Sequence, residues 1–149
     1  MTNLRFNHIA NRLKLVLVAM VLVLLSSVGA WAADVKVIAN SSVGATSISS
    51  GDLQAVFLLD KDSLGGSHVL PVLSKGGAAH EAFIKTYLGK NDSTLQAFYR
   101  ALVFTGKGSM PKALNSDAEI AAYVAKTKGA IGYVSGGAST EGAKTLQVK

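Results

Sequence analysis

Apolar residues recur along this 149-residue chain at two spacings, which predict two kinds of secondary structure. Short apolar runs rich in β-branched residues predict strands. Four such runs lie at residues 35–39, 69–73, 130–134 and 145–148. Apolar residues that recur three and four positions apart predict the buried stripe of an amphipathic helix. The four stripes are Leu53, Val56 and Phe57; Phe83, Ile84, Tyr87 and Leu88; Leu95, Phe98, Tyr99 and Leu102; and Ile120, Tyr123, Val124 and Thr127.

Polar residues and glycines mark where these helices are expected to begin and end. Ser49 is expected to cap the first helix, while Ser93 and Ser116 each precede Gln or Glu by three positions, as in a capping box. Gly89 and Gly129 follow the second and fourth stripes and are expected to end those helices. The predicted order is β-α-β-α-α-α-β-β, which indicates an α/β domain with a mixed sheet flanked by helices.

The first 32 residues are predicted to be a secretory signal peptide. A basic start with Arg5, Arg12 and Lys14 precedes an apolar run at 15–25, and residues 30–32 (AWA) form an A-x-A cleavage site. An uncleaved membrane anchor is the alternative, but this run is shorter than the roughly 20 residues that span a bilayer. We therefore predict cleavage after Ala32, one domain over residues 33–149, and a periplasmic or secreted protein that meets the membrane only through its leader.

Charge and composition narrow the classes of partner. The leader holds three of the fifteen Lys and Arg residues and none of the nine Asp and Glu residues, so the rest of the chain has a net charge of +3 rather than +6. A charge of +3, without a basic cluster that alternates with aromatic residues, predicts no nucleic-acid binding. The chain has no cysteine, so the exported domain holds together without disulfides. No spacing of His, Cys or carboxylates suggests a metal site, and no cofactor is expected.

The most informative stretch joins the predicted strand at 69–73 to the helix that follows it. It contains Ser74, Lys75, Gly76, Gly77, Ala78, Ala79 and His80. A strand, a glycine-rich turn and a helix start together favour anion binding, because the first backbone N–H groups of a helix have no internal partner and the helix dipole is positive there. Lys75 adds a positive charge. His80 has two open interpretations: a donor to the anion in mildly acidic solution, or an ordinary polar residue of the first helical turn.

Other polar residues favour structural interpretations. The small polar turn at residues 40–44 is more easily an ordinary strand exit than a ligand contact. Asp60 and Asp62 are expected in a solvated turn, and Lys107 is expected to be a surface lysine rather than an anion ligand. Ser, His and Asp residues are present, but no nucleophile elbow or paired base links them, so we predict that the protein is not an enzyme.

Several of these segments together resemble the phosphate-type substrate-binding proteins of ABC transporters. Residues 50–57 (SGDLQAVF) resemble a short helix of that family, and residues 69–83 resemble its strand, glycine turn and helix. Residues 95–106, with FYR and FTG, resemble the next helix and loop, and residues 128–134 (KGAIGYV) resemble its pGAIGYV strand. The resemblance covers residues 35–134. It implies a single lobe of a type II periplasmic-binding-protein-like fold.

The chain departs from the family pattern in two ways. Proteins of that family usually have two lobes that close on the ligand, and this chain is similar to one. The family's turn resembles R-S-D-G-S-G-T, whose Arg, Ser and Thr side chains hold phosphate. Here Leu73 stands at the Arg position, and Gly77 and Ala79 stand at the Ser and Thr positions. Losing those donors implies an affinity lower by on the order of 10³-fold, because each hydrogen bond to a charged group contributes about 1.5–3 kcal/mol.

Two functions follow from this resemblance. The first is a phosphate-type substrate-binding protein that binds a small oxyanion such as phosphate at residues 74–80, with an ABC permease as partner and with the site completed by a second chain. The second is a non-catalytic interaction module that keeps the lobe fold, has lost anion binding and binds another envelope protein.

Overall fold

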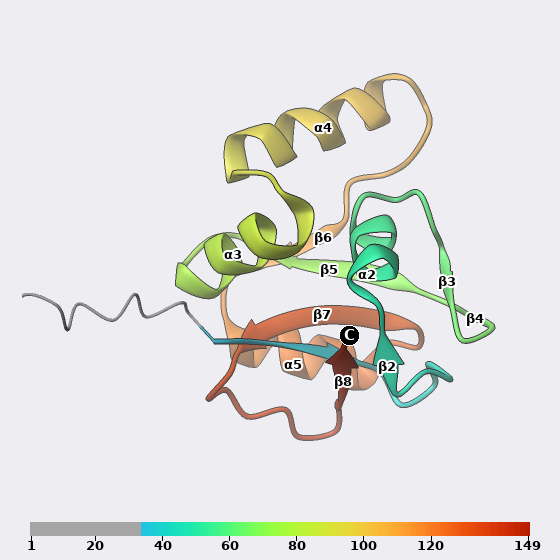
Figure 1. Cartoon of the computed structure of the whole chain (residues 1–149), viewed down its shortest axis with the longest axis vertical. Coiled ribbons are helices and arrows are strands. Elements are labelled where there is room, and N and C mark those ends of the chain that lie inside the picture. Colours follow the sequence, from blue (N-terminus) through green and yellow to red (C-terminus); the bar gives the residue numbers. More distant parts are fainter. Residues whose placement is uncertain (1–33) are drawn as a thin grey trace, which may run out of the picture. The chain divides into compact units, whose positions relative to one another are not determined.

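Six strands within residues 34–149, the part of the chain that the computed structural model describes, form one mixed sheet (Figure 1). They are β1 (Val35–Ala39), β2 (Ser47–Ile48), β5 (Leu70–Ser74), β6 (Lys112–Leu114), β7 (Ala130–Ser135) and β8 (Lys144–Val148). Their order across the sheet is β2-β8-β1-β7-β5-β6. β1 is antiparallel to β7 and β8, whereas β5 is parallel to both of its neighbours, β7 and β6. The predicted leader lies outside the described residues.

The four predicted strands are confirmed, with shifts of one residue at several ends. β1 has the predicted bounds, and β5, β7 and β8 differ from their predictions by one residue at one or both ends. The strands that sequence reasoning missed have only two or three residues: β2, β6 and the separate hairpin of β3 (Ser63–Leu64) and β4 (Ser67–His68). A run that short shows no alternation, because one apolar residue fits any period.

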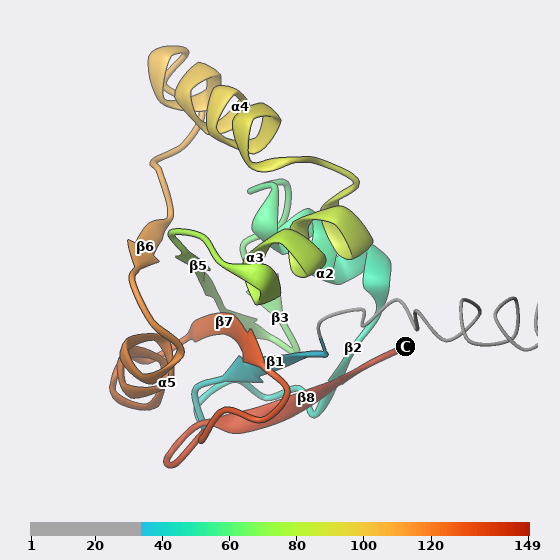
Figure 2. The ribbon, with the colours of Figure 1, turned by 90° about the vertical axis from the view of Figure 1, so that its left-hand side faces the viewer.

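Helices cover both faces of the sheet. They are α2 (Ser50–Phe57), α3 (Ala78–Phe83), η2 (Ile84–Leu88), α4 (Asp92–Phe104) and α5 (Asp117–Lys126), of which η2 is a π-helix that continues α3. Figures 1 and 2 show α2 and α3 on one face of the sheet, α5 on the other, and α4 farther out beyond α3. Within residues 34–149, no helix combines the length and apolarity that crossing a bilayer requires.

The period-two alternation of the strands divides the core into two apolar clusters. Val37 and Tyr133 point toward α2 and α3, in the larger cluster, while the intervening Ile38 and Val134 point toward α5, in the smaller one. All four side chains are essentially inaccessible to solvent. The described residues, 34–149, form a compact unit with these two clusters inside it, so we expect this part of the chain to fold on its own.

Two of the three predicted helix caps are confirmed, and one is wrong. Ser49 Oγ accepts the Asp52 N–H (3.0 Å), and Ser116 Oγ accepts the Glu119 N–H (3.2 Å). α4 is capped not by Ser93 but by Asn91, whose side-chain oxygen accepts the Thr94 N–H (2.8 Å). Asn and Ser are both common at the N-cap position. Asn91 is the cap because α4 begins at Asp92, about one turn before Leu95, the first residue of its apolar stripe.

Of the two glycines expected to end helices, Gly89 is confirmed as the C-cap of η2, whereas α5 is capped by Thr127, two residues before Gly129. Gly89 has φ +61° and follows η2, and Gly129 has φ +78° and lies three residues beyond the end of α5. Gly129 is also tightly packed: a Cβ there would lie 2.5 Å from the His68 carbonyl oxygen. The chain at Gly129 therefore needs glycine for space as well as for its backbone angle.

Candidate functional site

The glycine turn joins β5 to α3 at the end of a central strand of the sheet. Ser74 is the last residue of β5, Lys75, Gly76 and Gly77 are exposed, and α3 begins at Ala78. β5 lies between the parallel strands β6 and β7, so the turn emerges at their shared carboxyl edge. Ligand sites of open α/β sheets commonly lie at this edge.

Three hydrogen bonds hold the base of the turn. The Ser74 N–H donates to the Tyr133 hydroxyl oxygen (3.0 Å), and the Lys75 N–H donates to the Leu114 carbonyl (2.9 Å). The Ser74 hydroxyl donates to the Gly76 carbonyl (2.8 Å). The start of the turn is therefore tied to β6 and β7, and the hydroxyl of the buried Ser74 bonds within the same loop.

The following backbone N–H groups form a row of unpaired donors. Gly77 adopts φ 96° and ψ 169°, and its carbonyl accepts the Glu81 N–H (3.0 Å), the first bond of α3. Among the described residues, the N–H groups of Gly77, Ala78, Ala79 and His80 have no acceptor. Gly77 and Ala78 are exposed and Ala79 is half-buried, so solvent or an anion can reach this part of the row.

The His80 side chain points into the protein instead of toward the turn. It is 1% exposed, its Nδ1 lies 2.5 Å from the Tyr133 hydroxyl oxygen, and its Nε2 lies 3.0 Å from Asp92 Oδ1. Both ring nitrogens thus have partners inside the protein. Of the two interpretations of His80, the structure favours the structural one for the side chain, while its backbone N–H stays in the row of donors.

The hydrogen bonds around His80 have one consistent direction. Burial raises the pKa of Tyr133 far above its usual range, so its hydroxyl stays protonated. Because the Tyr133 oxygen accepts the Ser74 N–H, its own proton is assigned to His80 Nδ1. The His80 Nε2 proton then donates to the Asp92 carboxylate. A chain of hydrogen bonds runs from Asp92 on α4 through His80 and Tyr133 to the backbone of the turn.

Sequence reasoning missed the roles of Tyr133 and Asp92. The sequence pattern predicts Tyr133 only as part of the strand at residues 130–134, and it predicts no function for Asp92. They are 53 and 12 residues from His80 in sequence, and no local pattern connects residues so far apart. A tyrosine in an otherwise aliphatic strand was the one available signal, since a buried hydroxyl needs a hydrogen-bond partner.

Charge near the turn is mixed. Lys75 is exposed and forms no ion pair with any described residue, so its ammonium group can approach an anion. Glu81, also exposed, lies in the first turn of α3 and opposes that attraction. Leu73, at the position of the family's Arg, is 1% exposed and belongs to the larger apolar cluster. The side chains therefore supply little positive charge to the turn.

The other polar candidates have structural roles or lie at the surface. The Asn40 side-chain amide donates to the carbonyls of Val124 (2.8 Å) and Ala125 (2.9 Å), so it fastens the end of β1 to the end of α5. Lys107 is exposed. In the described part of the chain, His, Asp and Glu residues nowhere gather in a group of three that could hold a metal ion.

Comparisons with known proteins show what this fold is similar to. No protein-family model matches the chain, and no curated protein sequence matches it. Solved structures do match. A putative phosphate ABC transporter substrate-binding protein with bound phosphate from Clostridium perfringens has a TM-score of 0.60 at 16% identity, covering 78% of this chain and 45% of its own.

Two further structures give the same result. An ABC-type phosphate transport receptor from Vibrio cholerae has a TM-score of 0.59 at 11% identity, covering 78% of this chain and 46% of its own. PstS from Borrelia burgdorferi has a TM-score of 0.57 at 13% identity, with 78% and 47% covered. The chain thus spans about half the length of these proteins, and its α/β fold is that of one lobe of a phosphate-type substrate-binding protein.

Proposed function

We propose that this protein is an exported, phosphate-type substrate-binding lobe that binds a small oxyanion at residues 74–80. The observation that carries the proposal is the row of four backbone N–H groups, from Gly77 to His80, that have no acceptor among the described residues. It lies at a helix start in a fold shared with a protein described as having bound phosphate.

The chemistry of the turn suits a tetrahedral or planar oxyanion. Backbone N–H groups donate to the oxygens, and the helix dipole of α3 and η2 adds partial positive charge at Gly77. The Ser74 hydroxyl can turn from the Gly76 carbonyl toward a bound oxygen, and Lys75 supplies a mobile ammonium group. Each hydrogen bond to a charged oxygen contributes about 1.5–3 kcal/mol, so a few such bonds support weak binding without an arginine.

The same geometry predicts low affinity. Gly77 and Ala79 place no hydroxyl on the anion, and the turn is open to solvent on its outer side. A second lobe supplied by another chain would enclose the anion, as the two-lobed family pattern implies. We propose a periplasmic or secreted location, no catalytic activity, and an ABC permease or another envelope protein as partner.

Thermal unfolding of residues 33–149 tests the proposal. Phosphate, sulfate, arsenate and molybdate are compared with chloride at equal ionic strength from pH 5 to 8. A ligand present at 100 times its Kd adds about 2.7 kcal/mol to the free energy of unfolding. We expect a rise in the unfolding midpoint with at least one oxyanion in the millimolar range.

Two variants locate the binding site. Ala78→Pro removes one backbone donor at the first position of α3, where proline is compatible with the helix, and should reduce the midpoint shift. Lys75→Ala should also reduce it, whereas Lys85→Ala, which removes an exposed lysine from η2, should not. An equal shift in all three variants would place the anion elsewhere.

The alternative function is a non-catalytic interaction module that keeps the lobe fold without anion binding. The burial of Leu73 where the family carries Arg favours it, because no guanidinium can reach the turn from that position. If no oxyanion shifts the unfolding midpoint at millimolar concentration, this alternative replaces the proposal. Affinity capture from envelope extract, with residues 33–149 as bait, would then seek the partner.

A further inference from the structure

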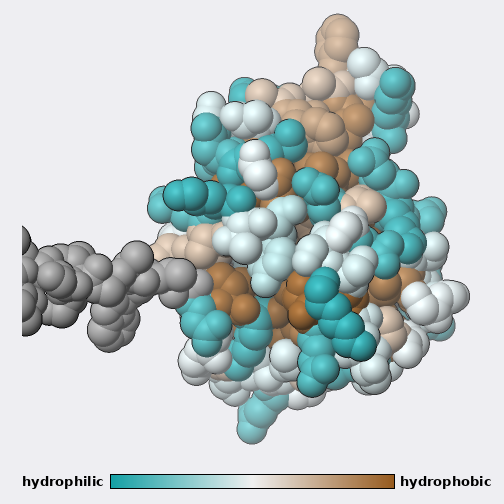
Figure 3. Space-filling view, in the orientation of Figure 1, coloured by the Kyte–Doolittle hydropathy of each residue, from teal (hydrophilic) through white to brown (hydrophobic). Residues whose placement is uncertain are grey.

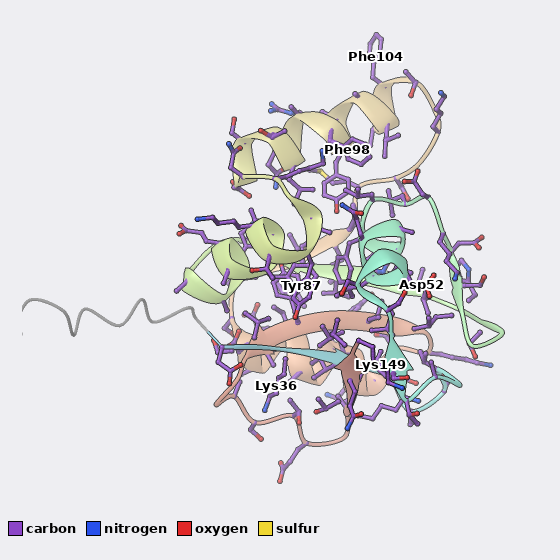
Figure 4. The ribbon with its side chains drawn as sticks, viewed as in Figure 1. Lys36, Asp52, Tyr87, Phe98, Phe104 and Lys149 are labelled. Carbon is purple, nitrogen blue, oxygen red and sulfur yellow. The ribbon has the colours of Figure 1, made fainter. Side chains whose placement is uncertain are left out.

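The end of α4 displays apolar side chains to solvent. Phe104, the last residue of the helix, is 93% exposed, and Val103 is 49% exposed. Figure 4 shows Phe104 pointing away from the rest of the protein, and Figure 3 shows an apolar protrusion at the same place. Adjacent apolar side chains exposed together, unlike single scattered ones, mark a candidate interaction surface.

A well-formed helix end holds Phe104 in place. Nine and five residues earlier, the fully buried Leu95 and Tyr99 anchor α4 to the larger cluster, and the Tyr99 hydroxyl donates to the Phe57 carbonyl (2.5 Å). The Thr105 hydroxyl donates to the Ala101 carbonyl (2.9 Å) and closes the last turn. The aromatic ring is therefore presented on a rigid element, because the opposite side of α4 is fixed to the core.

Two basic residues belong to the last turns of α4 and the loop after it: Arg100, whose Nε donates to the Gln96 carbonyl (3.3 Å), and Lys107. Arg100 lies one helical turn before Phe104 on the same face, and the Lys107 N–H donates to the Leu102 carbonyl (3.0 Å), which keeps Lys107 beside the helix end. Between Asp92 and Asp117 the chain has no acidic residue. Arg100 and Lys107 are exposed and form no ion pair with described residues. We call Arg100, Val103, Phe104 and Lys107 the α4 tip.

We propose that the α4 tip docks the protein on an anionic phospholipid surface. Phe104 and Val103 would enter the boundary between headgroups and acyl chains, and Arg100 and Lys107 would meet lipid phosphates. The charge of the tip disfavours its pairing with the same tip of a second copy. Its shape disfavours a protein partner, because a stable protein interface buries about 800 Å² per partner, whereas a soft lipid surface accepts a single protruding ring.

Sedimentation with lipid vesicles tests this docking. Residues 33–149 are used, because the apolar leader would bind vesicles by itself. We expect binding to vesicles of phosphatidylglycerol and phosphatidylcholine at low salt, little binding to phosphatidylcholine alone, and weakening as salt is added. Phe104→Ser should lower the partition coefficient about tenfold. Arg100→Gln and Lys107→Gln should each lower it about fivefold.

Two controls separate docking from other effects. Lys126→Gln removes an exposed lysine from α5, on the other face of the sheet, and should leave the partition coefficient unchanged. The chain's single tryptophan is Trp31 in the leader, so Phe104→Trp gives residues 33–149 a single fluorescent reporter. Its emission should shift to shorter wavelength when anionic vesicles are added.

Three results would overturn the proposal. The first is equal partitioning of the parent protein and Phe104→Ser, and the second is an unchanged emission spectrum of Phe104→Trp with anionic vesicles. The third is a dimer in solution that Phe104→Ser dissociates, which would assign the tip to a second copy of the chain. Because Phe104 is almost fully exposed, Phe104→Ser should unfold at the same temperature as the parent.

Discussion

Replacing Tyr133 by Phe tests whether the buried hydrogen-bond chain holds the glycine turn. The Tyr133 hydroxyl accepts the Ser74 N–H (3.0 Å) and lies 2.5 Å from His80 Nδ1, to which it donates. Its ring stacks on Phe83 with centroids 3.8 Å apart, and a phenylalanine ring keeps that contact. The substitution therefore removes the hydroxyl and leaves the packing of the ring in place.

The expected loss in the free energy of unfolding follows from the two groups that lose their hydrogen-bond partner. A buried donor or acceptor left unsatisfied costs about 1–3 kcal/mol, so the Ser74 N–H and His80 Nδ1 together cost about 2–6 kcal/mol. For a domain near 100 residues, 1 kcal/mol lowers the unfolding midpoint by about 4 °C or more. We therefore expect a fall of roughly 8–24 °C in a protein that still folds, since domains are commonly stable by about 5–15 kcal/mol.

Circular dichroism melts and urea unfolding of residues 33–149 measure this loss, and Tyr99→Phe is the matched control. Tyr99 is as deeply buried, but its hydroxyl holds one group, the Phe57 carbonyl (2.5 Å). Tyr99→Phe leaves that one carbonyl unsatisfied and should cost about 1–3 kcal/mol, half of the loss expected for Tyr133→Phe. If Tyr133→Phe costs no more than Tyr99→Phe, the hydrogen-bond chain does not hold the turn as described.

Two further predictions concern packing and pH. Gly129 and Gly66 share φ +78°, but a Cβ at Gly129 would lie 2.5 Å from a backbone oxygen, whereas at Gly66 it would meet nothing within 4 Å. Gly129→Ala should thus destabilise the protein more than Gly66→Ala in urea unfolding, and equal losses would contradict the close contact. Hydrogen bonds from Lys61 and Ser49 lower the pKa of Asp52 in the folded protein. The stability that this lowered pKa provides is present above the pKa of Asp52 in the unfolded chain and is lost as pH falls through its pKa in the folded protein. Lys61→Met should therefore make the free energy of unfolding fall less steeply as the solution is acidified. An unchanged dependence on pH would refute this.

The α/β fold was predictable because long, periodic segments carry it. β1 is a short apolar run rich in β-branched residues whose bounds were predicted without error, and the apolar run of β7 was found within one residue. The apolar stripes of α4 and α5 identified both helices. In each case several consecutive residues favour the same element, so local pattern and tertiary packing agree.

The elements that were missed depend on pairing and not on local pattern. β6 has three residues, Lys112–Leu114, and is a strand because it lies along β5. β2 similarly exists through two residues paired with β8. The helix cap at Asn91 was misassigned to Ser93, since both residue types favour that position and the first turn of α4 has no apolar residue to mark it.

The backbone of the candidate site was predictable from the sequence, whereas the positions of its side chains were only partly predictable. A glycine pair after a strand locates the turn and the free N–H groups of Gly77 and Ala78. The inward direction of His80 depends on Tyr133 and Asp92, which approach from β7 and α4. Contacts between residues so far apart in sequence arise only when the sheet and helices assemble, and periodicity does not encode them.

Backbone amide shifts in a nitrogen-15 NMR titration test the central claim most directly. Residues 33–149 are titrated with phosphate against chloride at equal ionic strength. Anion binding at the turn predicts saturable shifts for the N–H groups of Gly77, Ala78 and Ala79, with weaker binding in Ala78→Pro. Saturable shifts centred elsewhere, or no shifts at millimolar phosphate, would contradict the claim that this turn binds an oxyanion.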